Sequence, residues 1–98
     1  MVRDMLKKEL LDKIVKKLKT EGAKRIGVFG SYVRGEEYPD SDIDVLVEFS
    51  DRKSLLDIVG IEQELSDALR IKVDLLTEKS ISPYLIDRIK KEMVVIYG

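Results

Sequence analysis

The stretch that decides the fold reads FGSYVRG at residues 29–35 and, after a polar turn, SDIDVLV at residues 41–47. The Gly-Ser pair of the first half ends one apolar run, and Asp42 and Asp44 stand at the start of a second. Short apolar runs with charged or turn residues on either side are typical of buried strands. The sequence therefore predicts two strands, one ending in a Gly-Ser pair and one beginning with two carboxylates.

Two further strands are predicted along the chain, which places strands at residues 25–29, 43–49, 71–76 and 93–97. The strand at 43–49 is apolar on both faces, so we expect it to be central in its sheet. The closing residues 94–97 are mostly β-branched, as strand residues often are. We interpret them as core, the alternative being a surface for a partner or for self-association, formed by these residues or by the last helix.

Four helices are predicted, one before the first strand and three between the strands. Residues 3–20 carry apolar residues at spacings of three and four, which indicates an amphipathic helix. A short helix is expected after Ser31. Ser54 and Asp57 have the spacing of a capping box, which opens a helix with the apolar stripe Leu55, Ile58, Ile61, Leu65 and Leu69. Ser82 and Pro83 start the last helix, with an inner face of Leu85, Ile86, Ile89 and Met93. The order of elements predicts an α/β or α+β sheet covered by helices.

Composition limits what the chain can do. A length of 98 residues predicts one domain, residues 1–98. A net charge of −1 provides no overall field that would attract nucleic acid or anionic lipid. Cysteine and histidine are absent, which excludes disulfides, thiolate nucleophiles, the usual zinc ligands and histidine bases. No apolar run is long enough to cross a bilayer, so a cytoplasmic location is expected.

Three carboxylates are the candidate chemical groups. Asp42 and Asp44 are two positions apart on a strand, so they point the same way and Ile43 points into the core. If the strand that carries Asp74 lies beside this one, a third carboxylate joins the same edge. Two carboxylates about 4 Å apart repel by about 4 kcal/mol at an effective dielectric of about 20, so the cluster should bind a proton or a cation. Oxygen ligands favour magnesium or manganese.

Each acid also has a structural interpretation. Asp42 fits a turn that enters a strand, and Asp44 fits a buried acid paired with Arg34. Asp74 fits an ion pair with Lys72 or Arg70. All three together favour the functional interpretation, because half-buried acids on apolar strands cost several kcal/mol each unless they are paired or bound to metal.

The Gly30-Ser31 pair has the chemistry of a phosphate contact. A residue without a Cβ lets a phosphate approach the backbone, the serine hydroxyl and amide donate to it, and a following helix N-terminus favours its negative charge. A Gly-Ser pair on its own is usually a turn. Arg34 fits either a phosphate clamp or an ordinary surface charge.

Taken together, Gly30-Ser31, ten intervening residues and Asp42-Ile43-Asp44 match the Gly-Ser-x10-Asp-x-Asp signature of the DNA polymerase beta superfamily of nucleotidyltransferases. The fuller pattern, from residues 30–35 to 41–47, resembles the minimal nucleotidyltransferase family. Small members of that family are antitoxins paired with HEPN-domain toxins. The similarity extends from the first helix to the closing strand.

This resemblance implies a small mixed sheet of about four strands flanked by helices, the polymerase beta-like fold. It implies ATP as co-substrate, two Mg²⁺ ions, and transfer of AMP to a hydroxyl. Asp42 and Asp44 would ligate the metals, and Asp74 would hold the second ion and help to activate the hydroxyl. Gly30 and Ser31 would hold the β and γ phosphates.

The leading functional hypothesis is a protein adenylyltransferase that modifies a tyrosine of a cognate HEPN ribonuclease toxin, in a hetero-oligomer with that toxin. A second hypothesis is a nucleotide-binding antitoxin that neutralises its toxin by contact alone. A third is a nucleotidyltransferase for small molecules such as aminoglycosides, disfavoured because such relatives normally carry an additional substrate domain.

Overall fold

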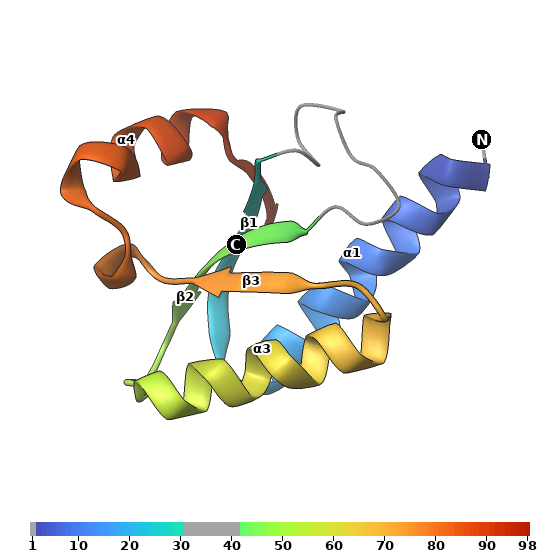
Figure 1. The fold of residues 1–98 in the computed structure, drawn as a ribbon, viewed down its shortest axis with the longest axis horizontal. Coiled ribbons are helices and arrows are strands. Elements are labelled where there is room, and N and C mark those ends of the chain that lie inside the picture. The colour runs from blue at the N-terminus through green and yellow to red at the C-terminus, as the bar shows by residue number, and fades with distance from the viewer. Residues whose placement is uncertain (1, 31–41) are drawn as a thin grey trace.

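The computed structural model describes residues 2–30 and 42–98 (Figure 1). The short helix predicted after Ser31 lies outside the described residues. The elements in chain order are α1 (Val2–Thr20), β1 (Ala23–Phe29), β2 (Ile43–Phe49), α3 (Leu55–Leu69), β3 (Val73–Leu76), the 3-10 helix η1 (Glu78–Ser80), α4 (Pro83–Glu92) and β4 (Val94–Tyr97). All four predicted strands and the other three predicted helices are present, with ends shifted by up to two residues.

The four strands form one mixed sheet in the order β3-β2-β1-β4. Strand β2 is parallel to β3, and β1 is antiparallel to both β2 and β4. The predicted central place of β2 is confirmed, because it has a hydrogen-bonded neighbour on each side. A mixed sheet flanked by helices is also the fold that the family resemblance implies.

The two faces of the sheet have different roles. On one face, alternate residues of the strands join side chains of α1 and α3 in a single buried core, which includes Ile14, Leu18, Ile26, Ile43, Val45, Ile61, Leu65 and Val73. Because strand side chains alternate between faces, Asp44, Leu46 and Glu48 of β2 belong to the other face. Figure 1 shows α4 across the strands from α3. The acids of the predicted site therefore lie on the sheet face away from the main core.

Helix α3 begins with the predicted capping box. The Asp57 N–H donates to Ser54 Oγ over 3.1 Å, and the Ser54 N–H donates to Asp57 Oδ2 over 3.1 Å. These hydrogen bonds from Ser54, its backbone N–H first, lower the pKa of the Asp57 carboxyl below its usual value. Leu55 was wrongly included in the apolar stripe, since it is 75% exposed. As the first residue of the helix, it precedes the turns that reach the core, where Ile61 and Leu65 are buried.

Helix α4 starts as predicted, with Pro83 at its first turn and Ser82 Oγ accepting from the Tyr84 N–H over 3.4 Å. The predicted inner face is wrong for Leu85, which is 50% exposed, and no residue of α4 is fully buried. Helix α4 supplies no side chain to the buried core, unlike α1 and α3.

Strand β4 corrects a second prediction. Val94 and Val95 are 52% and 41% exposed, so the interpretation of residues 94–97 as core is wrong for these two. Their exposure follows from the position of β4 at the edge of the sheet. Ile96 and Tyr97 are half-buried and pack against the core, as predicted. None of the helices in the described part of the chain is both long and apolar enough to cross a membrane.

The core assignment predicts unequal effects for two leucines of α3. Leu65 is 2% exposed, so Leu65→Ala should lower the free energy of unfolding by about 2–5 kcal/mol through lost burial and a residual cavity. Leu56 is 83% exposed, so Leu56→Ala should change it by no more than about 0.5 kcal/mol. Urea unfolding followed by circular dichroism measures both. Equal losses would show that the face of α3 has been assigned wrongly.

Candidate active site

The parallel pairing of β2 with β3 brings two carboxylates together. Asp44 is in register with Asp74, and both side chains are half-buried. Neighbouring strands lie about 4.8 Å apart, so two residues in register lie side by side on the same face of the sheet. This confirms the prediction that Asp74 lies beside Asp44 if their strands are neighbours. Ile43 is fully buried between Asp42 and Asp44, also as predicted.

Asp42 precedes β2 and is tied to the start of β3. Lys72 Nζ lies 3.8 Å from Asp42 Oδ2, and the Ile43 N–H donates to the Lys72 carbonyl oxygen over 2.9 Å. Of the structural interpretations of Asp74, the ion pair with Lys72 is wrong, because this lysine pairs with Asp42. Nor does Asp74 pair with Arg70 within the described residues. No sequence signal identified Lys72 as a neighbour of Asp42, because the register of two parallel strands cannot be read from the chain.

Gly30 directly follows β1 and lies beside Asp44. Its φ is +82°, in the left-handed region that favours glycine, and the preceding Phe29 is in register with Asp44. A Cβ at Gly30 would overlap Asp44 Oδ2. Glycine is therefore favoured at position 30 for two reasons: its backbone conformation suits glycine, and the Asp44 carboxylate occupies the space of a Cβ.

The backbone at Gly30 thus stands next to an acid, where a metal-bound phosphate could approach both. Ser31 and Arg34, the other predicted phosphate contacts, lie outside the described residues, and so does a pairing of Arg34 with Asp44.

The donor set suits a hard cation that a nucleotide shares. Within residues 2–30 and 42–98, no group of three or more acidic side chains is close enough together to hold a metal ion alone. Magnesium in nucleotide sites is usually held by one or two carboxylates, with phosphate oxygens and water completing the octahedron. The paired Asp44 and Asp74, with Asp42 next to them, fit that division of ligands.

A glycine turn beside two carboxylates on neighbouring strands is an arrangement that could hold a metal-bound nucleotide. The family model of the nucleotidyltransferase domain matches residues 9–96. The chain belongs to this family of nucleotidyltransferases. A candidate protein adenylyltransferase of Methanocaldococcus jannaschii is 50% identical over 86 residues, which are 88% of this chain and 92% of that protein.

Solved structures agree with the family. A toxin–antitoxin structure with AMP-PNP superimposes with a TM-score of 0.81 at 30% identity, covering 89% of this chain and 72% of that one. A complex of a tri-AMPylated Shewanella oneidensis HEPN toxin with an MNT antitoxin gives a TM-score of 0.76 at 27% identity, covering 93% and 71%. The resemblance to minimal nucleotidyltransferases and the predicted fold are confirmed.

Two glycines give a matched test of the site geometry. Gly30→Ala should lower the free energy of unfolding by at least about 1–2 kcal/mol, because alanine strains a left-handed backbone and its Cβ overlaps Asp44. Gly60→Ala should raise it by about 1 kcal/mol, because a Cβ there meets nothing within 4 Å and alanine favours the helix. Thermal and urea unfolding measure both changes. A Gly30→Ala chain as stable as the wild type would contradict the contact with Asp44.

Proposed function

We propose that this chain is an ATP- and Mg²⁺-dependent protein adenylyltransferase that transfers AMP to a tyrosine hydroxyl of a HEPN-domain ribonuclease toxin, and so acts as its antitoxin. The observation that carries this proposal is the register of Asp44 with Asp74 beside the glycine turn at Gly30. The similarity to antitoxins solved together with toxins and with AMP-PNP supports the choice of nucleotide and acceptor.

The acids have distinct tasks in this proposal. Asp42 and Asp44 would ligate Mg²⁺, and Asp74 would hold a second ion and accept the proton of the attacking hydroxyl. When bound, the two ions would supply charge stabilisation for an in-line displacement. The tyrosine oxygen forms the new bond to the α-phosphorus as the bond to pyrophosphate breaks, and pyrophosphate leaves.

Electrostatics gives a reason for the ions. Half-buried carboxylates on adjacent strands repel each other, by about 4 kcal/mol for charges about 4 Å apart at an effective dielectric of about 20. Lys72 offsets part of this charge at Asp42, over 3.8 Å and from a side chain that is 69% exposed. A divalent cation between Asp44 and Asp74 would reduce the repulsion between these two carboxylates.

In this proposal, the phosphates are bound by the Gly30-Ser31 half of the motif and by Arg34. Gly30 leaves the end of β1 open to a phosphate, and we assign Ser31 and Arg34 as its further contacts. We also assign residues 1–98 as one nucleotidyltransferase domain that works in the cytoplasm, in a hetero-oligomer with its toxin.

The test is the mass of the toxin after co-expression with this chain. The wild type should increase the toxin mass by one AMP unit per transferred group. Asp44→Asn and Asp74→Asn should each slow the transfer by about 10²-fold or more, the usual cost of removing one preorganised electrostatic contact with a transition state. Asp67→Asn, at an exposed position of α3, is the control and should leave the rate unchanged.

Two results would refute this function. Neutralisation of the toxin without any gain in its mass, equal for the wild type and the Asp44→Asn chain, would show inhibition by contact. Modification of an aminoglycoside, with no modification of a protein partner, would show a small-molecule enzyme.

A further inference from the structure

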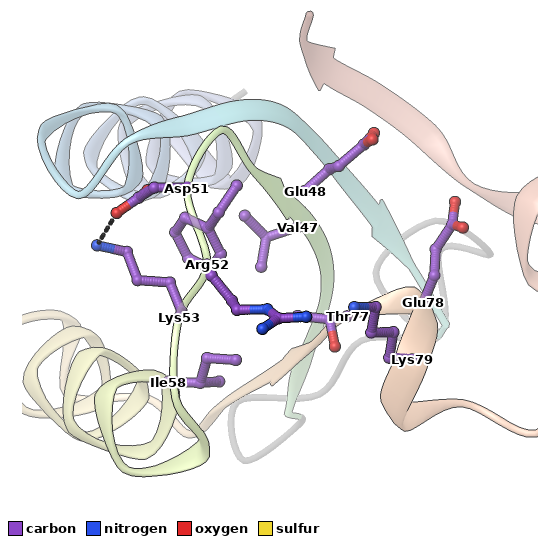
Figure 2. Close-up of a pocket in the computed structure, with 10 residues that line it drawn as sticks. Val47, Glu48, Asp51, Arg52, Lys53, Ile58, Thr77, Glu78 and Lys79 are labelled. Atoms are coloured by element: carbon purple, nitrogen blue, oxygen red, sulfur yellow. Dashed lines mark ion pairs between the residues drawn. The ribbon is translucent and has the colours of Figure 1, made fainter.

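A hollow lies at the opposite end of β2 from the acids. Its volume is about 310 Å³, and Val47, Phe49 and Ile58 form its apolar part (Figure 2). The lining extends from Val47, three residues along β2 from Asp44 or about 10 Å, to Phe49, five residues or about 17 Å away at the usual rise of a strand. None of the three acids of the candidate active site lines the hollow.

Three carboxylates and three cations line this hollow, so its lining alone is neutral. Each of its three lining carboxylates forms an ion pair with a lysine of the same chain: Glu48 with Lys24 at 3.4 Å, Asp51 with Lys53 at 3.4 Å, and Glu78 with Lys90 at 2.6 Å. Two lining cations, Arg52 and Lys79, have no ion pair within residues 2–30 and 42–98. Once the ion-pair partners Lys24 and Lys90 are counted with the lining, the cations outnumber the carboxylates by two.

Figure 2 shows Arg52 reaching from the loop after β2 toward Thr77 and Lys79 on the other side of the hollow. Arg52 and Lys79 both line the hollow, and neither forms an ion pair in the described part of the chain, so an anion bound near them would be stabilised. The planar guanidinium of Arg52 matches a carboxylate, which it can bind through two parallel hydrogen bonds. The hollow therefore suits a ligand group that combines a carboxylate with neighbouring apolar atoms.

Exposed apolar side chains continue from this hollow along α3. Leu55, Leu56 and Val59 are 75%, 83% and 46% exposed, and Leu55 is one helical turn from Ile58 of the hollow. A small molecule in the hollow would leave both leucines in water, whereas a protein surface would cover them. Exposed apolar residues next to an arginine are typical of the centre of a protein–protein interface.

Gly60 of α3 has open space where a side chain would lie. It lies one turn after Leu56, and a Cβ there would meet nothing within 4 Å. Glycine inside a helix costs about 1 kcal/mol relative to alanine, and nothing in the described chain requires it. Because glycine has no side chain, the backbone of another protein could approach α3 closely at this position.

We propose that the hollow with Arg52, Lys79, Leu55, Leu56 and Val59, here called the α3 surface, docks the partner protein through an acidic residue flanked by apolar side chains. This inference rests on the proposed function, because the partner is the toxin that the active site modifies. Docking at the far end of the sheet leaves the acids free for chemistry. It also keeps the toxin bound after AMP has been transferred.

The test separates docking from chemistry. Arg52→Glu with Lys79→Glu, and separately Leu55→Ser with Leu56→Ser, should each raise the Kd of the complex with the HEPN toxin by about tenfold or more. At saturating toxin, kcat for AMP transfer should stay within about twofold of the wild type. Added salt should weaken the wild-type complex more than the Arg52→Glu, Lys79→Glu complex.

The matched control is Lys8→Glu with Lys13→Glu, a reversal of the same two charges at exposed positions of α1, which should leave the Kd unchanged. Circular dichroism of each isolated variant shows whether it is folded.

Three results would overturn the α3 surface as the docking site. One is an unchanged Kd in both folded variants, and another is a fall in kcat without a change in Kd. The third is a dimer of the isolated chain that these substitutions dissociate, which would assign the surface to a second copy. If the substitutions weaken binding but the wild type transfers no AMP, the proposed function fails while the docking site stands.

Discussion

The parallel pairing of β2 with β3 is the interaction on which the site depends. It places Asp44 opposite Asp74, and it brings Lys72 beside Asp42 at the start of the same two strands. The buried side chains of Ile43 and Val73, which are in register with each other, fix this pairing in the core. A shift of one residue would turn every side chain of a strand to the other face and separate the acids. The packing of the core therefore determines the geometry of the carboxylates.

Much of this arrangement could be predicted from the sequence because it is local. The capping box at Ser54, the proline start of α4 and the direction of Asp44 relative to Ile43 depend on residues near each other in the chain. Exposure was harder to predict, since apolar spacing alone does not tell which end of a helix extends past the core. Leu55 and Leu85 continue apolar stripes beyond the surface that the sheet covers.

The tertiary neighbours could not be predicted at all. The pairing of Lys72 with Asp42, and the fit of Gly30 against Asp44, depend on strand register and on the end of β1. The position of Arg52 and Lys79, which form no ion pair within the described residues, likewise depends on tertiary contacts. In our proposals, chemistry and docking lie at opposite ends of one strand.

The central claim is that Gly30, Asp44 and Asp74 together hold a metal-bound nucleotide. The most direct measurement is the backbone amide NMR spectrum of the chain with a non-hydrolysable ATP analogue, titrated with Mn²⁺ in place of Mg²⁺. Paramagnetic broadening should affect the signals of Gly30, Asp44 and Asp74 first and leave those of Phe49 and Arg52 sharp. Broadening centred on Arg52, or none at Asp74, would contradict the account.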